Sequence, residues 1–231
     1  ICHCLVGSEM CIRDRLFIGS EGTLGLITEI KLKLYGQPAS IKSASCVFEN
    51  ISDAVETVIL AIQSGIQLAR VELLDEVQMQ GMNKYNKDLS FPEKPHLFIE
   101  FHGSELSTTE QVEDFKSISD EFGAYDFKWA TKTEDRNRLW KARHDAYWAG
   151  KSLWPQASSL VTDCCVPISS LASCISKTKE AINESDLLAP LVGHVGDGNY
   201  HLLILFDGTT RDGLKRAKEL AGRVNEIALS F

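Results

Sequence analysis

The sequence lacks the features that would assign it to a membrane or to nucleic acid. No run reaches about 18 consecutive apolar residues, so no transmembrane helix is expected. The 24 basic and 32 acidic residues give a net charge of −8 and are scattered, with no stretch rich in lysine and arginine, which argues against nucleic acid as a main ligand. There is no repeat of fixed period and no low-complexity tract. What remains is the composition of an ordinary soluble globular protein, 44% hydrophobic and 24% charged.

The seven cysteines form no C-x-x-C pair, so neither a zinc ribbon nor a thioredoxin-type motif is predicted. An odd number of cysteines also argues against a complete disulfide framework. We therefore expect a reducing compartment, in which most of the thiols are buried as small apolar groups.

The sequence also lacks an initiator methionine and a signal peptide, and it stops inside a helix-like segment, which predicts a fragment of a longer protein. The opening "ICHCLVGSEMCIRDR" resembles a translated cloning adaptor. We expect residues 1–13 to be a non-native leader. For that reason Cys2, His3 and Cys4 are not counted as a metal site.

A domain boundary is predicted at Pro38, in the linker-like stretch "QPAS". Before it, residues 14–38 contain a glycine-rich turn, and the apolar residues from Ile27 to Leu34 predict a strand. After it, residues 39–231 alternate between strand-like and helix-like stretches. This order predicts an α+β fold with an antiparallel or mixed sheet and helices on one face.

Several elements of residues 39–231 can be predicted individually. Strands are expected at 43–49, 69–75, 96–103, 126–131 and 159–167, and a hairpin at 191–206. Helices are expected from Ser52 to 65, up to Tyr85, from the capping box Ser107–Glu110 to 123, from the box Thr131–Glu134 to 150, at 169–183 and from Asp212 onward.

The stretch "GSEGTLG", residues 19–25, has the spacing G-x-x-G-x-x-G. This is neither the dinucleotide fingerprint nor a Walker A loop, because no lysine follows. From spacing alone a plain turn is favoured. The alternative is a loop whose backbone N–H groups approach a ligand closely.

Arg143 lies in a helix-like stretch, four residues from both Leu139 and Tyr147, and so on an apolar helical face. A guanidinium on such a face needs a carboxylate or phosphate partner, and its planar fork suits a carboxylate. An internal salt bridge, or a side chain that reaches the surface, is the alternative and is slightly favoured by periodicity alone.

The hairpin "LVGHVGDGNYHLLILF" carries two histidines. If residues 195–200 form its turn, His194 and His201 flank the turn on opposing strands, roughly 5 Å apart. Two imidazoles at that distance can share one divalent metal, and a third ligand must then come from elsewhere. A purely structural hairpin is the alternative and is favoured by spacing alone.

Six stretches resemble one known family in the same order along the chain, from about Asp14 to the end. They are "RLFIGSEGTLGLITEIKLKL", "VELLDEVQMQGMNKYN", "KPHLFIEFHGSE", "LWKARHDAYWAG", "TDCCVPIS" and "GHVGDGNYHLLILF". The chain thus resembles the FAD-linked oxidases of the vanillyl-alcohol oxidase type, and among them the mitochondrial cytochrome-linked D-lactate dehydrogenases. The resemblance implies that residues 14–38 end a PCMH-type FAD-binding domain, and that residues 39–231 are a truncated, ferredoxin-like C-terminal substrate domain.

The resemblance also implies roles for individual residues. It implies that His194 and His201 hold a divalent metal, zinc or manganese, and that Arg143 binds the substrate carboxylate. The third metal ligand and a catalytic base would belong to an E-H-G motif beyond Phe231, so the fragment alone should be inactive. The implied FAD contacts, made largely through the backbone, are Glu21, Gly22, Thr23, Leu24, Gly25, Leu26 and Ile27.

The activity implied for the full-length protein is flavin-dependent oxidation of a D-2-hydroxy acid to the 2-oxo acid in the mitochondrion, with cytochrome c or another electron acceptor. D-lactate is favoured, because Val161 and Leu203 stand where relatives acting on D-2-hydroxyglutarate carry polar residues. Glycolate and D-2-hydroxyglutarate remain alternatives. The rival classes are a flavin-linked transferase of the alkylglycerone-phosphate synthase type and a non-catalytic metal- or acid-binding module.

Overall fold

The computed structural model describes residues 16–34, 36–87, 90–130 and 132–231. It divides into two units, at 1–37 and 38–231. The expected leader at 1–13 lies outside the described residues, as does Thr131. The identity predicted for residues 14–38, the end of a FAD-binding domain, stays a prediction.

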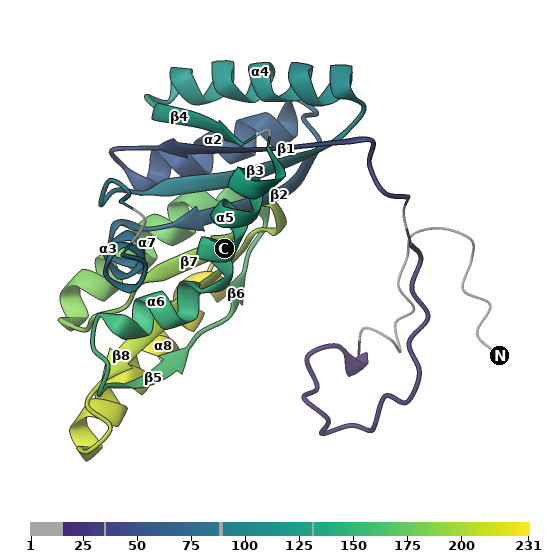
Figure 1. The fold of residues 1–231 in the computed structure, drawn as a ribbon. Coiled ribbons are helices and arrows are strands. Elements are labelled where there is room, and N and C mark those ends of the chain that lie inside the picture. The colour runs from purple at the N-terminus through teal and green to yellow at the C-terminus, as the bar shows by residue number, and fades with distance from the viewer. Residues whose placement is uncertain (1–15, 35, 88–89, 131) are drawn as a thin grey trace. The chain divides into compact units, whose positions relative to one another are not determined.

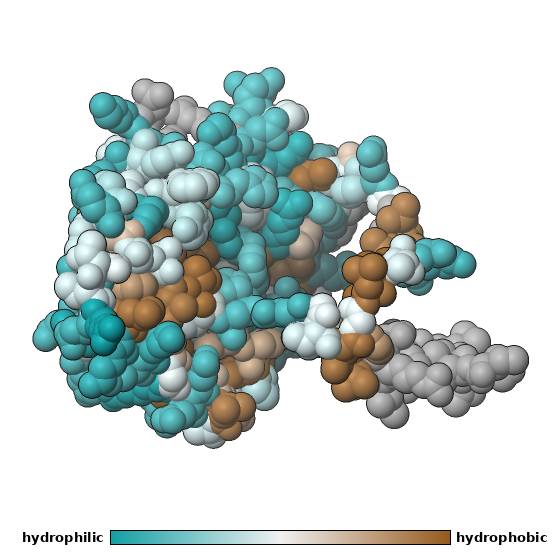
Figure 2. Space-filling model, turned by 90° about the horizontal axis from the view of Figure 1, so that it is seen from below, coloured by the Kyte–Doolittle hydropathy of each residue, from teal (hydrophilic) through white to brown (hydrophobic). Residues whose placement is uncertain are grey.

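The described part of the first unit is a turn-rich segment. The strand predicted from Ile27 to Leu34 is wrong for this structure, because these residues have no regular secondary structure. A strand needs a neighbouring strand to satisfy its backbone, and no described strand pairs with this segment. Its apolar side chains stay exposed, Leu32 at 74% and Leu34 at 84%. Figure 2 shows that hydrophobic residues are present at the surface of the molecule.

The second unit begins with a ferredoxin-like arrangement. Its strands β1 to β4 are all antiparallel and have the order β4-β1-β3-β2 in the sheet. The order along the chain is β1 (Ser40–Val47), α2 (Ile51–Gln63), β2 (Leu68–Leu74), α3 (Glu76–Tyr85), β3 (His96–Gly103), α4 (Glu105–Glu121) and β4 (Tyr125–Ala130). The α+β class and the ferredoxin-like start are therefore confirmed.

The rest of the chain extends this sheet beyond β2 in the order β7-β8-β5, and β6 also pairs with β8. The elements are α5 (Thr133–His144), α6 (Ala146–Ser152), β5 (Ser158–Val161), β6 (Cys164–Cys165), the single turn η1 (Ile168–Ser170), α7 (Leu171–Ser185), β7 (Leu191–His194), the turn η2 (Val195–Asp197), β8 (Asn199–Phe206) and α8 (Arg211–Leu229). Among the helices described, none has both the length and the apolarity needed to cross a membrane.

Helices cover both faces of the sheet, so the expected single helical layer is wrong (Figure 1). Alternate strand residues point to opposite faces, and Leu73 and Leu97 pack with α2, α4, α7 and α8 in the larger core. Leu74 and Phe98 pack with α3, α5 and α6 in a smaller core. We call the first the apolar face and the second the site face of the sheet.

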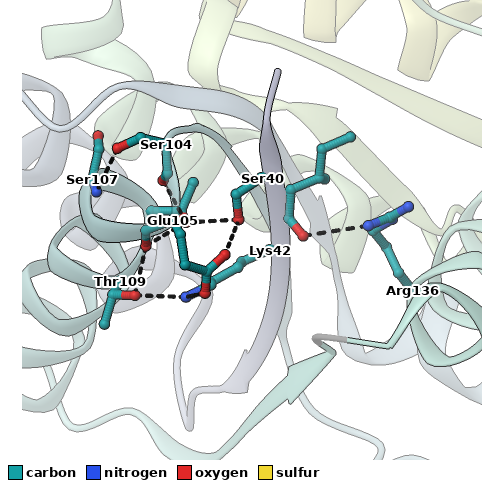
Figure 3. A network of polar contacts seen from close by, with 9 residues as sticks. Ser40, Lys42, Ser104, Glu105, Ser107, Thr109 and Arg136 are labelled. Carbon is teal, nitrogen blue, oxygen red and sulfur yellow. Dashed lines mark hydrogen bonds and ion pairs between the residues drawn. The ribbon is translucent and has the colours of Figure 1, made fainter. Parts of the chain in front are cut away.

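The start of α4 is tied to β1 by a polar network (Figure 3). Ser104, not the predicted Ser107, caps the helix: its hydroxyl accepts the N–H of Ser107 at 3.1 Å. In the first turn, the carboxylate of Glu105 accepts the Ser40 hydroxyl at 2.8 Å and pairs with the Lys42 ammonium at 2.9 Å. These contacts join α4 to the start of β1 and lie away from the histidine hairpin.

Two other predicted helix starts also differ from the structure. Helix α2 starts at Ile51 and follows Asn50, so Ser52 is inside the helix and is not its cap. Helix α5 starts at Thr133 after Lys132, which makes no side-chain capping bond. The predicted cap Ser52 is two residues after Asn50, and the predicted box began one residue before Lys132.

The single helix expected from residue 134 to 150 is broken at Asp145, which separates α5 from α6. Asp145 is a poor helix former, and its carboxylate is held by Lys141 at 2.9 Å. Arg143 and Tyr147 therefore lie on different helices, although both reach the site face.

The four cysteines within the described residues are free thiols. Cys46, Cys164 and Cys174 are buried, as expected, whereas Cys165 is exposed. Burial raises the pKa of the Cys164 thiol above its usual value, so this cysteine behaves as a small apolar group.

Candidate functional site

A cavity of about 310 Å³ opens on the site face and brings together the three side chains predicted to be catalytic. Arg143 comes from α5, His194 from β7 and His201 from β8. The remaining lining residues are Gln78, Ala146, Tyr147, Val161, Pro190, Val192, Leu202 and Leu203. A volume of this size is at the lower end of the range for small-molecule sites, which start at about 300 Å³.

The lining helix α6 is held close to the sheet by small residues and one amide. A side chain at Gly81 in α3 would come within 2.6 Å of the backbone oxygen of Ala149, so the two helices can approach this closely only with glycine there. The Gln78 amide donates to the Ala146 carbonyl at 2.8 Å. At Gly150 a side chain would meet Leu203 at 2.9 Å, which closes the apolar wall of the cavity.

Helix α3 is anchored in turn by a buried ion pair. Asp75 is fully buried and caps the helix by accepting the N–H of Gln78 at 2.8 Å. Its other oxygen pairs with Lys179 of α7 at 2.8 Å. Burial raises the pKa of Asp75, although Lys179 opposes this, while Asp75 and Glu76 raise the pKa of Lys179 against the effect of burial.

Arg143 is held by a carboxylate of the protein itself. Its Nε and Nη2 both donate to Oε2 of Glu72 on β2, at 3.0 and 2.9 Å. The two side chains are only 16% and 12% exposed. Of the two readings left open by the sequence, the internal salt bridge is present, but Arg143 also lines the cavity.

The same carboxylate holds the first histidine. Oε1 of Glu72 lies 2.9 Å from Nδ1 of His194. Since an ionised carboxylate only accepts, this contact assigns the proton of neutral His194 to Nδ1 and leaves Nε2 as an acceptor. Glu72 therefore links Arg143 and His194, two residues that line the cavity.

The two histidines are neighbours, but not in the predicted register. His194 pairs with Asn199 and His201 with Val192, because the turn is the four residues 195–198 and not six. His201 is two positions from the residue opposite His194, so both rings point to the same face. Their centroids are 5.3 Å apart and their planes meet at 82°.

His201 is also held through Nδ1. The Thr162 carbonyl lies 3.2 Å from that nitrogen and Asp163 Oδ1 lies 3.5 Å from it. The Asn199 amide donates to the same Asp163 oxygen at 2.7 Å. In the part of the chain that the structure describes, neither ring has a hydrogen-bond partner at Nε2.

This arrangement fits two of the ligands of a metal site. A histidine that binds a metal through one nitrogen usually donates the other N–H to a carboxylate or carbonyl, and both rings have such a partner. However, no group of three histidine, cysteine or carboxylate side chains converges among the described residues. The third ligand of the expected site is thus not found among them.

The loop expected to contact FAD is an exposed turn of the first unit. Gly19 and Gly22 both have φ of +78°, and Glu21 has φ of 49°. The N–H and the hydroxyl of Thr23 both donate to the carbonyl of Ser20, at 2.9 and 2.7 Å. A side chain at Gly19 or Gly22 would meet nothing within 4 Å, and the FAD contacts of this loop stay a prediction.

Glu72 is the residue of the site that the sequence reasoning missed. The signal was present in "ARVELLD", where a glutamate interrupts an apolar strand. Like Arg143, Glu72 is a charged residue in an apolar stretch and needs a partner. The sequence did not indicate that the two are each other's partners.

Comparisons with known proteins match most of the chain to one family model. Residues 37–231 match the family model described as FAD linked oxidases, C-terminal domain. The chain is 44% identical over 216 residues to a protein of Danio rerio named probable D-lactate dehydrogenase, mitochondrial, covering 94% of this chain and 43% of the relative. It is 42% identical over 218 residues to the mitochondrial D-lactate dehydrogenase [cytochrome] of Arabidopsis thaliana, covering 94% of this chain and 38% of the relative.

The chain therefore spans less than half the length of these two relatives. Among solved structures it is similar to 4-ethylphenol oxidase from Gulosibacter chungangensis, with a TM-score of 0.62 over 84% of this chain and 44% of that one. At 14% identity this likeness concerns the fold alone.

Proposed function

The chain belongs to the FAD-linked oxidases, whose C-terminal domain its residues 37–231 form, and on this basis we propose that the protein oxidises a D-2-hydroxy acid, D-lactate above others, to the 2-oxo acid. The observation that carries the proposal is the single cavity lined by Arg143, His194 and His201. It offers one cationic group, two imidazoles and an apolar wall within a volume suited to a small acid.

Arg143 would bind the substrate carboxylate. Glu72 uses the guanidinium edge formed by Nε and Nη2, which leaves Nη1 and one hydrogen of Nη2 for a second carboxylate. Because both side chains are mostly buried, that hydrogen-bonded contact is weakly screened by water. A substrate carboxylate would be bound through these remaining N–H donors, since Glu72 already balances the charge of Arg143.

The apolar wall would face the side chain of the acid. Val161 and Leu203 line the cavity together with Val192 and Pro190. A methyl group suits this wall, whereas the second carboxylate of D-2-hydroxyglutarate would lose its hydration there without a partner. This is why D-lactate is preferred over the dicarboxylate in our proposal.

His194 and His201 would contribute two ligands to a divalent cation, zinc or manganese, through Nε2, with a third ligand from outside the described residues. When bound, such a cation polarises the substrate hydroxyl and lowers its pKa. The residues Glu21 to Ile27 would contact FAD, mainly through their backbone. When bound, FAD supplies the acceptor for the hydride that leaves Cα. The described residues themselves bind and orient the acid.

The names of the relatives extend the proposal to location and electron acceptor. Both of the D-lactate dehydrogenases compared above are named mitochondrial, and the Arabidopsis protein is named for cytochrome. We propose the mitochondrion as the compartment, and cytochrome c or another one-electron carrier as the acceptor of the electrons.

The test is a substrate panel on the protein produced together with its FAD-binding domain. Reduction of an electron-accepting dye would be followed with D-lactate, L-lactate, glycolate and D-2-hydroxyglutarate. We expect D-lactate to give a kcat/KM about tenfold or more above glycolate, since one methyl group in an apolar pocket is worth about 10–200-fold. If kcat/KM were higher for glycolate than for D-lactate, glycolate would be the preferred substrate. No dye reduction by any of the acids, with FAD bound, would refute the enzymatic proposal.

A further inference from the structure

The two oxygens of Glu72 hold two different residues of the cavity, and we infer that Glu72 is a positioning residue that sets the orientation of Arg143 and the tautomer of His194. This inference rests on the proposed function and deepens it. Glu72 does not line the cavity proposed for the substrate but a second one, which it shares with His194, so it would act on the substrate through its two partners.

The carboxylate is on a rigid part of the fold. Glu72 lies within β2, which pairs with β3 on one side and, from the next residue onward, with β7 on the other. The residue is 9% exposed. A carboxylate that is taken out of water needs good hydrogen-bond partners, and Glu72 has three donors within 3.0 Å.

The contact with Arg143 fixes one edge of its guanidinium. With Nε and Nη2 on the same oxygen, the plane of the group cannot rotate without losing both bonds. The opposite end of the guanidinium is thereby presented in one orientation. A substrate carboxylate would meet a preorganised donor pair and would not have to order a flexible side chain.

The contact with His194 has a different consequence. Because an ionised Glu72 can only accept, it keeps the proton on Nδ1 and leaves the lone pair of Nε2 free. Nε2 is the nitrogen that the proposed cation would need. Without this carboxylate, nothing else among the described contacts of His194 selects the tautomer.

The substitution Glu72→Gln separates the two effects. The amide oxygen can still accept from Arg143, and the amide NH₂ is then turned toward His194. An NH₂ group can only donate to Nδ1, so the proton of His194 must move to Nε2. The variant therefore keeps Arg143 in place and reverses the tautomer of His194.

A matched control is available on the neighbouring strand of the same face. Glu100 of β3 is also buried and lies 2.8 Å from Nε2 of His102. It also accepts the Ser43 hydroxyl at 3.2 Å, and it does not line the cavity. Glu100→Gln thus changes an equivalent carboxylate–imidazole pair outside the site.

The experiment uses the full-length flavoprotein with isotopically labelled histidine, and assigns the ring protons by long-range NMR correlations of the imidazole nitrogens. We expect His194 to be protonated at Nδ1 in the wild type and at Nε2 in Glu72→Gln, and to be unchanged in Glu100→Gln. In a titration with Zn²⁺ alone, the dissociation constant for Zn²⁺ should be about 10–100-fold larger in Glu72→Gln than in Glu100→Gln.

Kinetics on D-lactate supply the second readout. In Glu72→Gln we expect kcat to fall about 10–100-fold while KM stays within about threefold, because Arg143 keeps its acceptor. In Glu72→Ala, where both contacts are lost, KM should rise as well. An unchanged His194 tautomer in a folded Glu72→Gln variant, or equal losses in Glu100→Gln, would overturn the inference.

Failure of the proposed function gives a different pattern. If D-lactate is not oxidised by the wild type but the His194 tautomer reverses in Glu72→Gln, the assignment of the substrate is wrong and the positioning of His194 by Glu72 stands. If the wild type oxidises D-lactate and the tautomer does not reverse, the positioning role is wrong and the activity stands.

Discussion

The two faces of the sheet are made by the same strands and differ in what they bury. The apolar face packs Leu73, Leu97 and Phe101 against four helices, in one continuous core. The site face alternates with it residue by residue and buries charges: Glu72 and Glu100 lie there, each paired with a histidine. Most of the apolar burial is therefore on one face of the strands, and the buried carboxylates Glu72 and Glu100 are on the other.

The largest effect is expected from breaking the apolar face. Phe101 is fully buried and its ring lies 5.8 Å from that of Phe115, edge to face. Phe101→Ala should lower the free energy of unfolding by about 4 kcal/mol, because it removes apolar contacts and leaves a cavity. Urea unfolding would measure this.

In the folded fraction of Phe101→Ala, the kcat/KM for D-lactate should stay within about twofold of the wild type, since Phe101 points away from the cavity. A large loss of activity per folded molecule would mean that the two faces are coupled more tightly than their alternation suggests.

The next effect, on stability against pH, should come from the site face. His96 is 2% exposed, its Nδ1 lies 2.7 Å from the Lys94 carbonyl, and its ring packs edge-on against Phe91 and Phe98. Burial lowers the pKa of His96 from 6.5 to about 4. Between these values the unfolded chain binds the proton and the folded chain does not. Stability is therefore full above pH 6.5 and is lost as the pH falls toward 4, by up to about 3 kcal/mol.

The measurement is the free energy of urea unfolding at several pH values between 7 and about 4.5, for the wild type and for His96→Leu. The wild type should lose more stability on acidification than the variant. Parallel pH profiles would show that His96 does not carry this dependence and that other groups do.

Much of the fold could be predicted because its signals are local. Strands such as β3 and helices such as α7 follow from apolar period and turn residues. The failures have non-local causes. The segment from Ile27 to Leu34 reads as a strand, but a strand depends on its pairing partner. The second helical layer could not be predicted either. The alternation of side chains along a strand shows which residues share a face of the sheet, but not which elements cover that face.

The sequence predicted the side chains that line the cavity, but not the contacts that connect them. Arg143, His194 and His201 were singled out from charge and spacing, and the structure brings them to one cavity. The one residue that joins Arg143 to His194 was not, since Glu72 is 71 and 122 positions away from them. A contact of that separation is set by strand order, which a single sequence does not encode locally.

The smallest of these effects, and the one that tests the site face most directly, is the substitution Arg143→Lys. The lysine keeps the charge but loses the fork that can serve Glu72 and a substrate carboxylate at the same time. We expect kcat/KM for D-lactate to fall about a hundredfold, equivalent to about 2.7 kcal/mol, mainly through KM.

The matched control is Arg136→Lys, earlier on α5, where the guanidinium donates to the Ile41 carbonyl at 3.3 Å and lies outside the cavity. That variant should stay within about twofold of the wild type. Equal losses in both variants would mean that α5 serves the fold and not the substrate, and that the charge on the site face has only a structural role.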